Sequence, residues 1–210
     1  MIKTILFQGD SITDARRQRD DETAYGPGFG YGYAGRIAST LLNRYIDQDL
    51  TCINRGISGN RIVDLYARWK IDALNLNPDL ISILIGVNDV WHERSNKNGV
   101  ELPRFEMVYR MLLQWTKEVL PQCRLVLCEP FTLPSETVVD QAFYDDVASY
   151  AAVVEKLAKE FDTVFVPLQQ VLSDAAKRAG DNKKILIDGV HPAMIGSQII
   201  AEQWMKYVNL

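Results

Sequence analysis

The chain has 210 residues, of which 47% are hydrophobic and 24% charged, with a net charge of −4. This composition is typical of a globular protein, and the length suffices for one domain with a full hydrophobic core. We therefore expect a single domain over residues 1–210. The excess of acidic side chains argues against nucleic acid as a partner, because surfaces that bind nucleic acids are basic.

Apolar runs are short throughout the chain. None reaches the roughly 18 consecutive apolar residues of a transmembrane helix, and the run at the N-terminus is too short for a signal peptide. The three cysteines, Cys52, Cys123 and Cys128, are odd in number and lack metal-ligand spacing, which favours free thiols in a reducing compartment. The sequence thus predicts a cytoplasmic protein with no membrane partner, no metal and no cofactor. A homo-oligomer remains an open option.

Short β-branched runs alternate with longer segments of helical periodicity along the whole chain. The expected strands are residues 5–7, 51–53, 80–85, 125–128 and 163–166. The expected helices are residues 33–45, 61–74, 105–119, 143–161 and 193–208. The run at 80–85 is apolar almost throughout, as in a parallel strand that is buried on both faces. This alternation predicts the α/β class, as a flavodoxin-like three-layer α/β/α sandwich with a mainly parallel five-stranded sheet.

A serine and a histidine lie at informative points of this pattern. Ser11 follows the first strand in Gly-Asp-Ser-Ile-Thr, and His191, one of only two histidines, precedes the last helix in Asp-Gly-Val-His-Pro. A nucleophilic serine needs a base, for which His191 is the candidate, and Asp188 can accept the Nδ1 proton of that ring. The alternatives are ordinary: Ser11 as a helix cap, Asp188 as a turn or N-cap residue, and His191 as a structural histidine.

Two further polar segments follow the second and third strands. Gly59 ends Arg-Gly-Ile-Ser-Gly, and Asn88 lies in Gly-Val-Asn-Asp. The carboxyl ends of parallel strands meet at one edge of the sheet, so both segments are expected close to Ser11. The backbone N–H groups of Ser11 and Gly59 and the side-chain amide of Asn88 are therefore candidate donors to an oxyanion. Taken alone, each segment also fits an ordinary strand-to-helix turn.

Together these blocks resemble the SGNH (GDSL) hydrolase family. Ser11, Gly59, Asn88 and His191 stand at the family's four named positions, and Asp188 stands at its aspartate. The blocks span residues 9 to 192, and the one departure in the first block is isoleucine in place of leucine after the serine. The resemblance implies a metal-free serine hydrolase with a Ser-His-Asp triad and an acyl-enzyme intermediate.

Longer stretches are similar to microbial carbohydrate esterases that remove acetyl groups from xylan-type sugars. These stretches cover residues 9–14, 55–60, 64–69 and 85–91. The similarity implies an esterase that removes short acyl groups, above all acetyl, from a small-molecule or oligosaccharide ester. Two alternatives stay open: a lysophospholipase or thioesterase of the same family, and a catalytically dead module that binds a sugar or nucleotide.

Several residues near these blocks have two interpretations. Asp10 is expected to tie down the loop after the first strand, with substrate contact as the weaker alternative. Trp91 is either a core residue or a platform for a flat sugar ring. His92, in a polar loop, is expected at the surface, with substrate contact as its alternative. The charged run at residues 16–22 is interpreted as a solvated loop.

The segment Gly30-Tyr-Gly-Tyr-Ala-Gly35 fits the spacing of a dinucleotide-binding fingerprint. A fingerprint of this kind must follow a strand directly, whereas a long polar loop precedes this one. We therefore expect these glycines to shape a loop. Its aromatic residues are expected to border the site or pack beneath it: Tyr25, Phe29, Tyr31 and Tyr33.

Overall fold

The computed structural model describes residues 2–20, 27–136 and 139–210. Within these ranges the strands form one five-stranded sheet of order β2-β1-β3-β4-β5, and every neighbouring pair is parallel. The strands are β1 (Thr4–Gly9), β2 (Thr51–Asn54), β3 (Leu80–Leu84), β4 (Arg124–Cys128) and β5 (Val164–Val166). This strand order is that of the flavodoxin-like fold, so the predicted fold class is confirmed.

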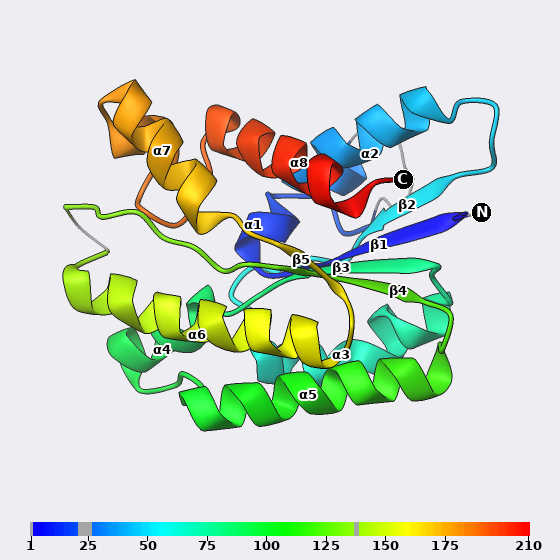
Figure 1. Cartoon of the computed structure of the whole chain (residues 1–210), viewed down its shortest axis with the longest axis horizontal. Helices are drawn as coiled ribbons and strands as arrows, with labels where there is room; N and C mark the ends of the chain where they lie inside the picture. Colours follow the sequence, from blue (N-terminus) through cyan, green and yellow to red (C-terminus); the bar gives the residue numbers. More distant parts are fainter. Residues whose placement is uncertain (1, 21–26, 137–138) are drawn as a thin grey trace.

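Helices cover both faces of the sheet (Figure 1). One layer contains α2 (Tyr33–Arg44), α7 (Gln169–Ala179) and α8 (Met194–Val208), and the other contains α3 (Ile62–Asp72), α4 (Val87–Asn96), α5 (Leu102–Val119) and α6 (Gln141–Glu160). The short helix α1 (Ser11–Asp14) and the 3-10 turns η1 (Pro27–Phe29), η2 (Leu74–Leu76) and η3 (Asn182–Lys184) complete the described elements. No helix in these ranges is both long and apolar enough to cross a bilayer.

Buried aromatic side chains join the layers to the sheet. The ring of Phe7 in β1 packs against Tyr33 of α2 and Trp204 of α8, with centroid distances of 6.2 and 5.9 Å. In the other layer the indole N–H of Trp69 in α3 donates to Thr116 Oγ1 in α5 at 2.9 Å. The core therefore combines apolar burial with hydrogen bonds between some of the polar groups that it encloses.

Three of the described helices, α1, α4 and α7, were not predicted, and the polar loop expected around His92 is helical as far as Asn96. In α4 the buried residues all lie in the first turn, residues 87–90, so the sequence shows no apolar period. His92, expected at the surface, is half-buried there. Helix α7 buries Leu172, Ala175 and Ala176 at helical spacing, but alanines give a weak hydropathy signal. Helix α1 is a single turn.

The charged run at 16–22 departs from the expected solvated loop at one residue. Arg17 is buried, and its Nε donates to the carbonyl oxygen of Gly56 at 3.0 Å. The neighbouring residues 16 and 18–20 are exposed, while residues 21 and 22 lie outside the described ranges. A buried guanidinium needs hydrogen-bond acceptors, and here the acceptor is a backbone carbonyl on a distant loop.

The aromatic residues of the glycine-rich loop have different environments. Phe29 and Tyr33 are buried, and the Tyr33 hydroxyl lies 3.0 Å from Thr13 Oγ1 in α1, the helix that begins at Ser11. Tyr31 lines a cavity beside Ser11 and is 63% exposed. Tyr25 lies outside the described residues. Both expected locations, beneath the site and at its border, are therefore observed among the residues that the structure describes.

The carboxyl ends of the strands lie at one edge of the sheet (Figure 1). Ser11 follows β1 at this edge, and the segment between α7 and α8 brings His191 to the same place. The parallel sheet thus joins two residues that are 180 positions apart.

A buried hydrogen bond gives a test of the core. Ser82 in β3 accepts from the indole N–H of Trp204 at 3.0 Å, and both residues are fully buried. Ser82→Ala leaves this N–H without its partner, so we expect the free energy of unfolding to fall by about 1–3 kcal/mol. Urea unfolding followed by fluorescence measures the change.

The matched control is Ser39→Ala, at an exposed serine of α2 whose hydroxyl donates to the carbonyl oxygen of Arg36. We expect a change within about 0.5 kcal/mol, as for most surface substitutions. Equal losses in the two variants would contradict the importance of the buried hydrogen bond.

Candidate active site

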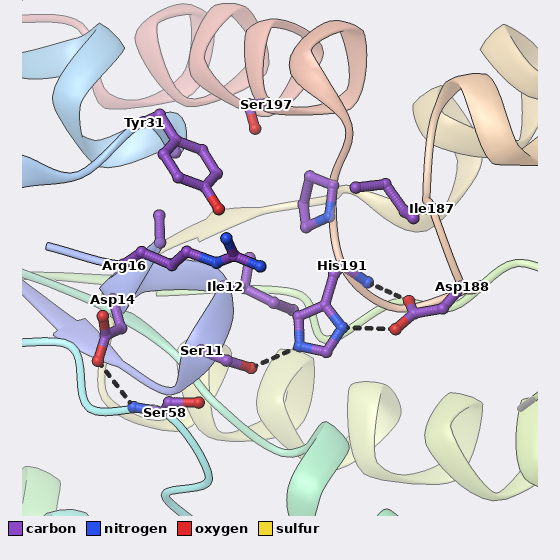
Figure 2. Close-up of a pocket in the computed structure, with 13 residues that line it drawn as sticks. Ser11, Ile12, Asp14, Arg16, Tyr31, Ser58, Ile187, Asp188, His191 and Ser197 are labelled. Atoms are coloured by element: carbon purple, nitrogen blue, oxygen red, sulfur yellow. Dashed lines mark hydrogen bonds and ion pairs between the residues drawn. The ribbon is translucent and has the colours of Figure 1, made fainter.

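Ser11, His191 and Asp188 form a continuous hydrogen-bonded chain (Figure 2). Ser11 Oγ lies 2.8 Å from His191 Nε2, and His191 Nδ1 lies 2.7 Å from Asp188 Oδ2. A carboxylate can only accept, so the ring proton belongs on Nδ1. The lone pair of Nε2 then faces the serine hydroxyl, which is the arrangement that a general base requires.

The local fold of residues 186–192 positions the histidine. Asp188 Oδ1 accepts the backbone N–H groups of Val190 and His191 at 2.9 and 2.8 Å. Leu186 and Pro192 form an antiparallel bridge that closes the turn. Helix α8 begins later, with Ala193 as its N-cap residue. Asp188 is therefore a turn residue and the partner of the imidazole at once, through different oxygens.

The electrostatics of the pair are coupled. The hydrogen bond that His191 donates to Asp188 raises the pKa of His191 above its usual range, although partial burial acts in the opposite direction. Burial favours a higher pKa for Asp188, but the hydrogen bonds from the ring and the backbone of His191 outweigh it and lower the pKa to about 2. Asp188 is thus ionised throughout the range in which the imidazole titrates.

Asp10 holds the start of α1. Its Oδ1 accepts the N–H of Ile12 at 2.9 Å, and its side chain is 1% exposed. Burial raises the pKa of Asp10 to about 7, against the opposing effects of that hydrogen bond and of nearby His191. These contacts fit the predicted loop-fixing role, and Asp10 is not part of the cavity lining.

The candidate oxyanion donors lie on the neighbouring loops. Gly59 has a φ of +84°, which glycine adopts without strain, and a Cβ built there would meet nothing within 4 Å. One amide hydrogen of Asn88 Nδ2 goes to the carbonyl oxygen of Asn60 at 3.1 Å, and the amide carries a second hydrogen. Among described residues, the backbone N–H groups of Ser11 and Gly59 have no hydrogen-bond partner. Three donors are therefore available at this edge.

Further polar contacts, which the sequence analysis did not identify, hold the turn at residues 58–60. Asp14 Oδ2 accepts the N–H of Ser58 at 3.0 Å (Figure 2). Arg68 Nε donates to Asn60 Oδ1 at 2.8 Å. Asp14 and Arg68 lie within the sequence stretches that resemble carbohydrate esterases, and this was the only sequence signal for them. Their hydrogen-bond partners depend on the packing of distant segments and could not be predicted. These contacts fix the Gly59 turn relative to α1 and α3.

A cavity of about 340 Å³ opens beside Ser11. Its lining includes Ser11, Asp188 and His191, together with Ser58, and leaves out Gly59, Asn88, Asp10 and Trp91. Its volume lies at the lower end of the range for small-molecule sites, about 300–1,000 Å³. Within the described ranges, no group of three or more His, Cys, Asp or Glu residues is arranged to hold a metal ion.

Trp91 packs behind the imidazole. Its ring centroid lies 5.9 Å from that of His191 and 6.0 Å from that of Phe143, and the side chain is half-buried. Packing on this side restricts the rotation of the histidine ring. These contacts are those expected if Trp91 is a core residue. Its alternative role, as a platform for a sugar ring, stays a prediction.

Comparisons with known proteins agree with this fold. The model of the GDSL-like lipase/acylhydrolase family matches residues 7–199. The acetylxylan esterase of Geobacillus stearothermophilus is 31% identical over 98% of this chain and 93% of that protein. A crystal structure of that enzyme, Axe2, has a TM-score of 0.88, with 30% identity over 99% of this chain and 94% of the other. A Parabacteroides merdae protein assigned as a GDSL-like lipase has a TM-score of 0.91, with 41% identity over 97% and 94%.

The fold, the site and these relatives define a carboxylic ester hydrolase. The chain belongs to the GDSL-like lipase/acylhydrolase family. The resemblance to this family is therefore confirmed, and a non-catalytic binding module is set aside.

The two histidines provide an internal comparison for the electrostatics. The pKa of His191 is raised by Asp188, whereas burial lowers the pKa of His92. In an NMR titration of the imidazole signals we expect His191 to titrate above about 6.5 and His92 below it. Asp188→Asn removes the negative charge and should shift the His191 midpoint downwards while leaving that of His92 in place. A His191 midpoint unaffected by this substitution would contradict the interpretation.

Proposed function

We propose that this protein is a serine esterase that removes short acyl groups, acetyl foremost, from carbohydrate esters. The observation that carries the proposal is the hydrogen-bonded chain from Ser11 through His191 to Asp188, with contacts of 2.8 and 2.7 Å, at the wall of a cavity. Catalytic mutants of the Geobacillus enzyme have a serine or an aspartate replaced by alanine, which supports the same residue types here.

In the proposed reaction, Ser11 Oγ attacks the ester carbonyl carbon while His191 Nε2 takes the hydroxyl proton. The tetrahedral intermediate then collapses, the bond to the alcohol oxygen breaks, and His191 returns the proton to the leaving alcohol. Water, deprotonated by the same nitrogen, attacks the acyl-enzyme, and the carboxylic acid leaves as Ser11 recovers its proton. Asp188 keeps the ring in the tautomer needed and stabilises the imidazolium that forms twice in each cycle.

The negative charge of each intermediate rests on the former carbonyl oxygen. We assign its stabilisation to the backbone N–H groups of Ser11 and Gly59 and to the Nδ2 hydrogen of Asn88 that Asn60 does not use. Donors held in place before the reaction need no reorganisation when the charge develops. The bonds that fix Ser58 and Asn60 support this assignment, because they hold the intervening Gly59 on both sides.

Short acyl groups suit the size of the site. A cavity of about 340 Å³ has to take both the acyl group and part of the alcohol. The similarity to an acetylxylan esterase supports acetyl as the acyl group and a sugar hydroxyl as its carrier. Three assignments stay predictions: the cytoplasmic location, which the free buried cysteines favour, the single domain, and any homo-oligomer.

Asn88→Ala tests the oxyanion assignment. The substitution removes one side-chain donor without altering Ser11 or His191, so kcat for p-nitrophenyl acetate should fall by about 10²–10³-fold. Asn98→Ala serves as the matched control, at an exposed asparagine beyond α4, and should retain normal turnover. Normal hydrolysis by Asn88→Ala would show that this residue has no such role.

Ser11→Ala tests the nucleophile and the substrate class together. We expect no acetate release from acetylated xylo-oligosaccharides and no labelling by a fluorophosphonate, with an unchanged circular dichroism spectrum, because only one hydroxyl is lost. The unaltered enzyme should release acetate and react with the probe.

The same assay distinguishes the alternatives within the family. An esterase for short acyl groups should hydrolyse p-nitrophenyl acetate faster than the butyrate and much faster than the octanoate. A preference for octanoate, or for lipid or thioester substrates over acetylated sugars, would contradict the proposal and favour a lysophospholipase or thioesterase. Labelling of Ser11→Ala by the probe would contradict the assignment of the nucleophile.

A further inference from the structure

An arginine outside the proposed catalytic machinery lines the cavity. Arg16 is exposed, and its guanidinium points across the cavity between the Tyr31 hydroxyl and the His191 ring (Figure 2). Among the residues that the structure describes, this side chain has no hydrogen bond or ion pair. The cavity beside the nucleophile therefore contains a positive charge that is in contact with no acidic group of residues 2–20, 27–136 and 139–210.

The carboxylates that share this cavity are already engaged. Asp14 Oδ2 accepts from Arg19 Nη2 at 2.8 Å and from the N–H of Ser58 at 3.0 Å. Asp188 accepts from the ring and the backbone of His191. Among the charged residues of the lining, Arg16 is thus the one that has no opposite charge in contact with it in the described part of the chain.

The backbone holds Arg16 in a conformation that non-glycine residues rarely adopt. Its φ is +60°, directly after Ala15 at +46°, in the left-handed region. On one side of Arg16, the carbonyl oxygen of Ala15 accepts the N–H of Tyr31 at 3.2 Å. On the other side, the buried Arg17 donates to Gly56. The backbone of the turn is thus fixed at both ends, and the Arg16 side chain lines the cavity.

The glycine-rich loop makes room for this turn. A Cβ on Gly30 would lie 2.3 Å from the carbonyl oxygen of Ala15, and one on Gly32 would lie 2.6 Å from the Cβ of Ala15. Larger residues at either position would displace Ala15 and the arginine that follows it. Two glycines of the segment that resembles a nucleotide-binding fingerprint, Gly30 and Gly32, thus leave room for the turn that carries Arg16.

We propose that Arg16 binds a negatively charged group on the alcohol part of the ester, so that the enzyme prefers acidic over neutral acetylated sugars. This inference rests on the proposed esterase function and narrows its substrate class. A guanidinium donates two parallel hydrogen bonds to a carboxylate or a phosphate.

Three acetylated methyl glucosides that differ only at C6 test the proposal. They carry a neutral hydroxymethyl group, a carboxylate or a phosphate there, with the acetyl group on the same ring hydroxyl. The unaltered enzyme should have a kcat/KM about tenfold or more higher for at least one anionic ester than for the neutral one. The anionic ester with the higher kcat/KM shows whether the preferred substrate is an acidic sugar or a phosphorylated sugar.

Arg16→Gln should bring the ratio of anionic to neutral kcat/KM to about one, and Arg16→Lys should restore part of it. Arg44→Gln is the matched control, since Arg44 is an exposed arginine in the last turn of α2, and its ratio should equal that of the unaltered enzyme. Equal kcat/KM values for all three esters, or an equal loss on all three in Arg16→Gln, would overturn the proposal.

A binding measurement separates this inference from the proposed function. Methyl glucuronoside and methyl glucoside are titrated calorimetrically into Ser11→Ala, with and without Arg16→Gln. Tighter binding of the glucuronoside that depends on Arg16 supports the inference even if no sugar ester is hydrolysed, in which case only the proposed function fails. Hydrolysis of the neutral ester without any preference for an anion leaves the function standing and refutes the inference.

Discussion

The geometry of the site depends on the Asp188 carboxylate. One oxygen closes the turn by accepting two backbone N–H groups, and the other accepts the Nδ1 proton of His191. The turn and the imidazole ring of His191 are therefore positioned by the same carboxylate. Its pKa of about 2 keeps it ionised while the imidazole titrates, so a proton gained or lost by His191 does not remove the hydrogen bond that orients the ring. Trp91 supports this orientation by packing on the same ring.

The position of Ser11 depends on a different set of contacts, namely buried hydrogen bonds between the loops that follow β1 and β2. Asn54 at the end of β2 donates to the carbonyl oxygen of Thr13 at 2.8 Å, and Arg17 donates to that of Gly56. Buried polar groups destabilise a fold unless they are hydrogen-bonded, so these pairs define one relative position of the two loops. Asp10 is one of several exceptions within the described residues, because its buried Oδ2 has no hydrogen-bond partner. A pKa near 7 means that protonation of Asp10 lowers the cost of burying it.

The parts that the sequence predicted are those with a local signal. The central strand β3 is apolar almost throughout because it is buried along its whole length, and the edge strands β2 and β5 show up as short runs that alternate with helical segments. Ser11 and His191 were identified because each adjoins an element at the carboxyl edge. Helix α4 was missed since its buried residues occupy one turn only. The burial of Arg17 has no local signal either, because its acceptor lies 39 residues away. Contacts of this kind arise from the packing of loops that are distant in the chain.

The proposed catalytic groups touch only the ester carbonyl and the oxygens bonded to it, so they cannot distinguish one alcohol from another. Selectivity must come from side chains that reach the rest of the substrate, and these lie in the loops around the cavity. Arg16 and Arg17 have different roles in one such loop. Arg17 is buried and anchors the backbone, whereas Arg16 has a positive φ and lines the cavity. A left-handed arginine costs folding free energy, and within the described residues no contact of its side chain offsets that cost. A ligand with the opposite charge would supply the missing partner.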